Sequence, residues 1–124
     1  MQEILFRGKR KDDGEWVYGD LTHVIRITPN GDEKCIRVGG YDVDQSTIGQ
    51  FTGILSSKGE KIFEGDIIEQ LEDPFPMIIR WNQSRLCFSC SYFINGKYVS
   101  SPISALDSFL YSYTNIISNI HDNL

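Results

Sequence analysis

Four turn dipeptides recur along this chain, and each stands between segments rich in branched and aromatic residues. They are Asp13-Gly14, Asn30-Gly31, Lys58-Gly59 and Asn95-Gly96. Asn-Gly and Asp-Gly favour the positive φ angles of tight hairpin turns. Branched and aromatic residues are typical of β-strands. The spacing of the turns therefore predicts a succession of short antiparallel strands.

Helical periodicity is weak by comparison. The one candidate is Ser101–Leu110, where Pro102 suits a first helical turn and apolar residues recur at helical spacing. The following segment, Phe109–Tyr113, alternates with a period of two, as a strand does. We predict an all-β fold with at most one short helical turn. Because short strands must close or cover their edges, we expect a small SH3-like or related closed barrel, or a compact two-sheet fold.

The size and composition of the chain fit one domain over residues 1–124. The chain is 40% hydrophobic and 23% charged, which is ordinary for a soluble protein, and it can bury roughly 67% of its surface. It has neither an apolar run of membrane-spanning length nor the apolar stretch of a signal peptide. Its three cysteines, an odd number, fit a reducing compartment. We expect a cytoplasmic protein.

A corner made of glycine and aspartate occurs twice. Segment 14–21 resembles segment 59–67, since each reads as a turn, a short apolar stretch, the corner and then a strand. Glycine accepts an unusual backbone angle at such a corner, and aspartate accepts backbone N–H bonds. A catalytic carboxylate pair would need an approach of roughly 5–10 Å, which nothing in the sequence enforces. We interpret both corners as structural: Gly19-Asp20 and Gly65-Asp66.

Motifs for catalysis or metal binding are weak. Cys87 and Cys90 form a C-x-x-C pair, but they lie in an expected strand, where residues three apart point to opposite faces. A structural zinc site would usually need a second such pair. His23 and His121 accompany no recognisable nucleophile motif. We therefore predict packed thiols, no metal, no cofactor and no catalytic residue, in a protein that is not an enzyme.

Charge and aromatic content bear on the partner. The net charge of −5 argues against a general nucleic-acid coat. Aromatic residues make up 12% of the chain, and exposed aromatic rings can stack single-stranded bases or anchor a protein. Nucleic-acid binding therefore stays open beside protein binding. We expect the contact surface to combine a basic run with residues further along: Arg7, Lys9, Arg10, Trp81 and Arg85.

Several blocks of the sequence resemble the YopX family of phage and prophage proteins. They cover residues 6–10, 14–21, 43–53 and 59–68, and the ending 117–123 is similar to the family's closing Ile-Gly-Asn-Ile segment. Ser118 stands where the family usually has glycine. The resemblance implies a β-barrel architecture and no established activity, so it transfers no catalytic residue. The matching glycines suit turns or close backbone approach, and the matching aromatics suit the core: Gly8, Gly19, Gly53 and Gly65; Trp16, Tyr18, Phe51 and Phe63.

These observations lead to a ranked set of functions. The first is a phage or prophage accessory protein, a non-catalytic interaction module that binds a phage or host protein in the bacterial cytoplasm, alone or as a homo-oligomer. The alternative is a β-barrel that binds single-stranded DNA or RNA, an expectation that rests on fold analogy only. An enzyme of unrecognised type is the third.

Overall fold

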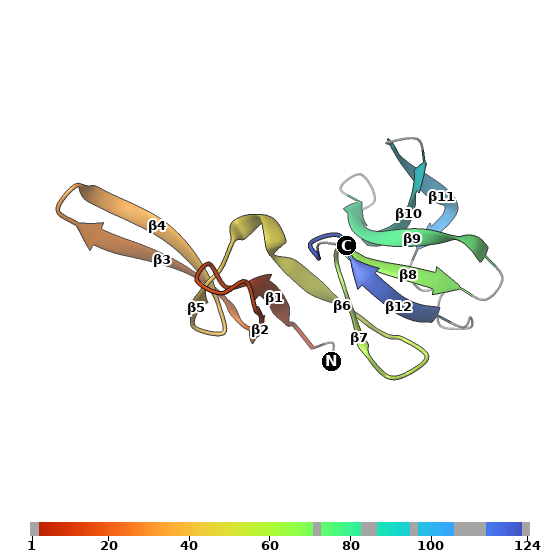
Figure 1. The fold of residues 1–124 in the computed structure, drawn as a ribbon, viewed down its shortest axis with the longest axis horizontal. Coiled ribbons are helices and arrows are strands. Elements are labelled where there is room, and N and C mark those ends of the chain that lie inside the picture. Colours follow the sequence, from red (N-terminus) through yellow and green to blue (C-terminus); the bar gives the residue numbers. More distant parts are fainter. Residues whose placement is uncertain (1–2, 71–72, 83–86, 95–96, 106–113, 123–124) are drawn as a thin grey trace. The chain divides into compact units, whose positions relative to one another are not determined.

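A computed structural model describes residues 3–70, 73–82, 87–94, 97–105 and 114–122. It confirms the all-β prediction, with one short 3-10 turn in the described residues (Figure 1). The elements are β1 (Phe6–Lys9), β2 (Trp16–Gly19), β3 (Leu21–Thr28), β4 (Gly31–Val38), β5 (Tyr41–Asp42), η1 (Gln45–Thr47), β6 (Gly49–Leu55), β7 (Lys61–Phe63), β8 (Asp66–Gln70), β9 (Asp73–Asn82), β10 (Cys87–Ile94), β11 (Lys97–Ala105) and β12 (Thr114–Asn119).

The chain divides into two compact units, Met1–Phe51 and Thr52–Leu124. Strand β6 runs from the first unit into the second, and it pairs with β1 at its start and with β7 further along. The single domain over residues 1–124 stays a prediction.

The first unit is built from two hairpins. β1 pairs with β2 around the Asp13-Gly14 turn, and β3 pairs with β4 around Asn30-Gly31. The second hairpin is long, with a regular register from Leu21↔Val38 to Thr28↔Gly31, and β5 adds a short third strand beside the end of β4 (Figure 1). Two of the turns expected from the sequence therefore form hairpins here.

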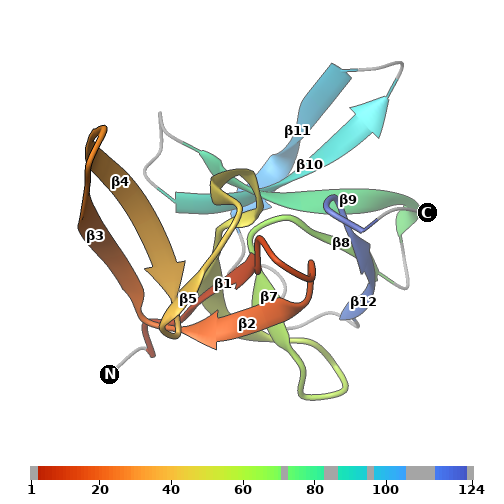
Figure 2. The same ribbon diagram turned by 60° about the vertical axis from the view of Figure 1, so that its left-hand side comes forward.

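The second unit holds the main hydrophobic core. Its five-stranded antiparallel sheet has the order β11-β10-β9-β8-β12, with β9 between β8 and β10 (Figure 2). β7, which follows the Lys58-Gly59 turn, contributes Ile62 to the same core. The buried cluster consists of Ile62, Ile68, Met77, Ile79 and Cys90. Burial of these side chains is the main favourable term for this unit.

Two details of the sequence-based fold need correction. None of the three sheets closes into a barrel within the described residues, because β11 and β12 lie at opposite edges of the largest sheet instead of pairing. The helical candidate is wrong where it is described: Ser101–Ala105 belong to β11, which pairs with β10. Ladder hydrogen bonds with β10 outweigh weak helical spacing there. Residues 106–113 lie outside the described residues.

The two Gly-Asp corners are built differently. Gly65 has a φ of +94°, and the buried Asp66 carboxylate accepts the Phe63 N–H at 2.7 Å. At the other corner the Asp20 side chain is exposed, and its backbone carbonyl accepts the Gly39 N–H at 3.1 Å. The carboxylate therefore serves the backbone in the second unit only.

Candidate interaction surface

The basic run at the start of the chain packs on aromatic rings. The register Arg7↔Tyr18 and Lys9↔Trp16 places these four side chains on one face of the β1–β2 hairpin. The Arg7 guanidinium carbon lies 4.5 Å from the Trp16 ring centre, and Lys9 Nζ lies 5.3 Å from it. Arg7 is only 5% exposed. Its charge is therefore used inside the unit in a cation–π contact and is not presented at the surface.

Arg10 is neutralised by its own neighbours. Its guanidinium lies 4.5 Å from the Tyr41 ring centre and forms ion pairs with Asp12 at 3.0 Å and Asp13 at 3.4 Å. The hydrogen bond from Arg10 holds the pKa of the Asp12 carboxyl below its ordinary value. An open cavity of about 280 Å³ lies here, lined by Arg10, Lys11, Asp12, Arg37, Gly40, Tyr41 and Asp42.

The other two residues expected at a binding surface come later in the sequence, after the first unit. Trp81 is exposed, but it belongs to the second unit and packs edge-on against Phe88, with ring centres 5.1 Å apart. Arg85 lies outside the described residues.

The expected core aromatics divide between interior and surface. Phe51 and Phe63 are buried, and Trp16 is half-buried. Tyr18 is 52% exposed and so lies at the surface, not in the core. The expected glycines Gly8 and Gly53 lie within β1 and β6.

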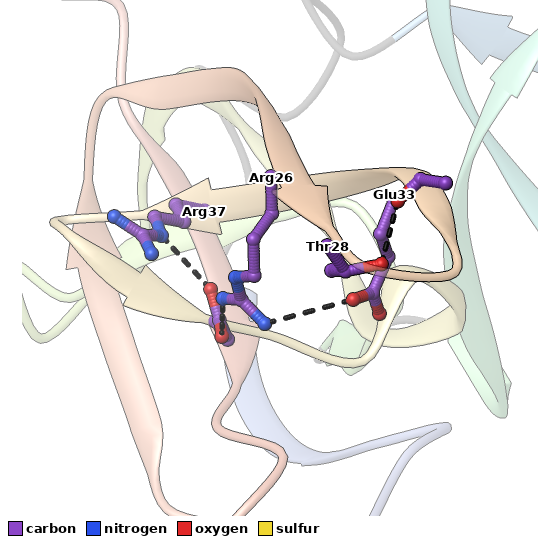
Figure 3. Close-up of polar contacts among 6 residues, drawn as sticks. Arg26, Thr28, Glu33 and Arg37 are labelled. Carbon is purple, nitrogen blue, oxygen red and sulfur yellow. Dashed lines mark hydrogen bonds and ion pairs between the residues drawn. The ribbon is translucent and has the colours of Figure 1, made fainter.

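Charged residues of β3, β4 and β5 form an ordered network on one face of their sheet. Asp42 accepts from Arg37 Nε at 2.8 Å through one carboxylate oxygen and from Arg26 at 2.9 Å through the other. Arg26 also pairs with Glu33 at 3.8 Å. Figure 3 shows Arg26, Arg37 and Glu33 together, with Thr28 nearer the turn, where its hydroxyl donates to the Gly31 carbonyl. The arginines on this face are therefore paired with carboxylates of the same sheet.

The network affects the pKa of Asp42. Hydrogen bonds from Arg37 and then Arg26 lower the pKa of Asp42 from its ordinary value of 3.8. Because the pKa of Asp42 is lower in the folded state, its ion pairs stabilise the fold fully at a pH above the ordinary pKa. This stabilisation is lost as the pH falls through the lowered pKa. We expect carboxyl-carbon NMR to place the Asp42 midpoint below its ordinary value, and Arg37→Ala to move it upward. An Asp42 midpoint that Arg37→Ala leaves unchanged would contradict the assignment of the shift to Arg37.

The opposite face of the β3–β4 hairpin is apolar and exposed. Ile25 is 64% exposed and Ile27 is 84% exposed, and both point away from the Arg26 face because side chains alternate along a strand. Across from them on β4 stand Lys34 and Asp32, also exposed. In the described part of the chain, neither of these two charged side chains takes part in an ion pair or hydrogen bond. We call Ile25, Ile27, Asp32 and Lys34 the apolar hairpin face.

Sequence reasoning did not single out this face. Its signal is the pair Ile25 and Ile27 on either side of Arg26, which is the period-two pattern of a half-buried strand. The pattern predicts that the isoleucine side is covered. In this unit nothing among the described residues covers it, as the exposed fractions show.

Thiol and histidine side chains form no chemical cluster in the described residues. Cys90 is buried, and burial raises its pKa. In the pairing of β10 with β9, Cys90 stands across from Ile79 and Cys87 across from Asn82. No group of three or more His, Cys, Asp or Glu residues in the described ranges could hold a metal ion. Over the same ranges, no helix has the length and apolar character that a membrane crossing requires.

Comparison with known proteins identifies the family. The model of the YopX protein family matches residues 5–124. No curated protein matches the chain. Among solved structures, protein EF1440 from Enterococcus faecalis is similar in fold, with a TM-score of 0.56 and 21% sequence identity over 99% of this chain and 96% of that one. The family match spans nearly the whole sequence, and the chain belongs to the YopX family.

Proposed function

We propose that this YopX protein is a non-catalytic protein-interaction module and that the apolar hairpin face is its contact surface. The observation that carries the proposal is the exposure of Ile25 and Ile27 side by side on β3. Single exposed apolar residues are common on protein surfaces. Two on one face of the β3–β4 hairpin differ, because β5 pairs only with the far end of β4 and the sheet has two strands at these rows. Two-stranded β-structure is marginally stable in water without a covering layer. A protein partner would supply that layer.

The charges of the first unit favour a protein over a nucleic acid. Phosphate binding needs cations that are available to replace counterions. Arg7 is buried against Trp16, and Arg10 is bound by two carboxylates. The apolar hairpin face itself offers one lysine and one aspartate. We propose a phage or host protein as the partner class, in the bacterial cytoplasm, in keeping with the family resemblance.

Affinity capture tests this function. We would immobilise the full chain and two variants, Ile27→Ser and Ile4→Ser, and expose them to a lysate of the bacterium that carries the gene. Ile4 is the matched control, because it is also an exposed isoleucine (69%) but lies outside the hairpin. We expect the wild type and Ile4→Ser to retain the same protein and Ile27→Ser to lose it. Equal capture by both variants would count against the proposal.

Fluorescence anisotropy tests the alternative function. Labelled single- and double-stranded DNA and RNA would be titrated with the full chain at low and physiological salt. We expect no binding at physiological salt, because the cations of the basic run are engaged within the unit. Binding that persists at that salt concentration, together with no protein captured from the lysate, would replace the proposed function with nucleic-acid binding.

A further inference from the structure

We infer that the occupant of the apolar hairpin face is a second copy of this chain, bound about a two-fold axis. The inference rests on the proposed function, in that this face contacts protein. It adds the identity of the partner, which the arrangement of charges on the face indicates.

The face is built from two rows that cross the hairpin. The register pairs Ile25 with Lys34 in one row and Ile27 with Asp32 in the next. Each row therefore has an isoleucine on β3 and a charged residue on β4. The pair between the rows, Arg26 and Glu33, points its side chains to the other face. The rows thus carry the same apolar residue and opposite charges.

A two-fold axis makes these rows complementary to each other. We place two hairpin faces against one another, with the axis between them, perpendicular to the strands and level with the Arg26–Glu33 pair. The rotation reverses the order of the rows but keeps β3 over β3 and β4 over β4. Ile25 then meets the partner's Ile27, and Lys34 meets the partner's Asp32. The symmetric contact gains two isoleucine pairs and two opposite-charge pairs from one small surface.

The remaining charges of the hairpin support this choice of partner. Asp32 and Lys34 take part in no ion pair within the described residues, so an intermolecular pair breaks no internal one. On the opposite face, Arg26 and Arg37 are already bound by carboxylates of the same unit. Among the described residues, the unpaired charges of the hairpin thus lie on the apolar hairpin face, and a contact through this one face closes as a dimer. Eight-residue strands span only about 27 Å, so the interface falls in the small, weak class.

A charge exchange tests the two-fold contact. In Asp32→Lys the introduced lysine faces the partner's Lys34, and in Lys34→Asp the introduced aspartate faces the partner's Asp32. We expect each single variant to dimerise roughly tenfold more weakly than the wild type. A one-to-one mixture of the two variants brings opposite charges together again at both positions. The mixture and the double variant, Asp32→Lys with Lys34→Asp, are both expected to regain wild-type dimerisation.

Sedimentation velocity provides the measurement. The wild type would be examined from about 10 µM to about 1 mM, the range in which a small interface associates. Both exchanged residues are exposed, so stability should change little, and circular dichroism verifies the fold. Recovery in the mixture also requires folded variants. A mixture that stays monomeric while the wild type dimerises would overturn the two-fold contact.

The outcomes separate this inference from the proposed function. A wild type that stays monomeric at every concentration overturns the dimer. If Ile27→Ser nevertheless abolishes capture from the lysate, the proposed function survives with a different partner. Concentration-dependent dimerisation that both single variants weaken and their mixture restores supports the inference, whatever the lysate yields.

Discussion

Replacing Ile79 with alanine is expected to lower the free energy of unfolding of the second unit by about 2–5 kcal/mol. Ile79 lies on β9 with no exposed surface, in the cluster with Ile62, Ile68 and Met77. The change removes part of a fully buried side chain, so its transfer free energy is lost. It also leaves a cavity, which the neighbouring strands can fill only partly because their ladders fix their positions.

Urea denaturation followed by tryptophan fluorescence measures this loss. Trp81 stands two residues beyond Ile79 on β9 and reports on the same unit. A Trp16→Phe background removes the signal of the first unit. Ile4→Ala is the matched control, because Ile4 is exposed and the same substitution there should change stability by less than about 0.5 kcal/mol. A loss below about 1 kcal/mol for Ile79→Ala would show that this cluster is not a packed core.

The hairpins could be predicted because turn chemistry is local. Asp13-Gly14, Asn30-Gly31 and Lys58-Gly59 each precede a strand that pairs with the one before the turn. The strand order of the largest sheet could not be predicted in this way. β12 pairs with β8, far away in the chain, and no short-range signal encodes that choice. This is why the sequence indicated strands correctly but did not indicate whether they close.

Burial could be predicted less well than strand position. Arg7 and Tyr18 are cross-strand neighbours, yet the arginine is buried and the tyrosine is exposed. Residue type alone predicts the reverse. The Arg7 guanidinium packs on the Trp16 ring, so a cation–π contact accompanies the burial of this charge. The basic run likewise lies against aromatic residues of its own unit, and the exposed Ile25 and Ile27 stand on a different hairpin.

Two local features of the backbone were not predicted from the sequence. Asp44 caps the 3-10 turn η1, where its side chain accepts the Ser46 N–H at 3.1 Å, and aspartate is a favoured capping residue. In β12 the register shifts between Ile116 and Ser118. Glycine is common at such bulges, and the bulge lies next to Ser118, the position at which the sequence departs from the resemblance.

The turn between β4 and β5 gives the second large expected effect. We expect Gly39→Ala to destabilise the first unit by about 2–4 kcal/mol, and Gly40→Ala by only about 1 kcal/mol. Both glycines have positive φ, +60° and +87°, so both variants share the cost of a left-handed backbone. The two positions differ in the atoms that surround an added Cβ. A Cβ on Gly39 would lie 2.7 Å from the Tyr18 carbonyl oxygen, whereas a Cβ on Gly40 would meet nothing within 4 Å.

The close contact at Gly39 is between two backbone segments, residues 18–19 and residue 39. Backbone cannot rotate away as a side chain can, so removing the clash of an added Cβ is costly. A Cβ on Gly19 would in turn lie 2.8 Å from the Gly39 Cα, so these segments approach at a distance that only glycine allows. The Gly39 N–H also donates to the Asp20 carbonyl there. An alanine must push these segments apart and stretch that hydrogen bond. Urea denaturation in a Trp81→Phe background follows the first unit through Trp16, and equal losses for the two variants would show that φ strain alone requires the glycines.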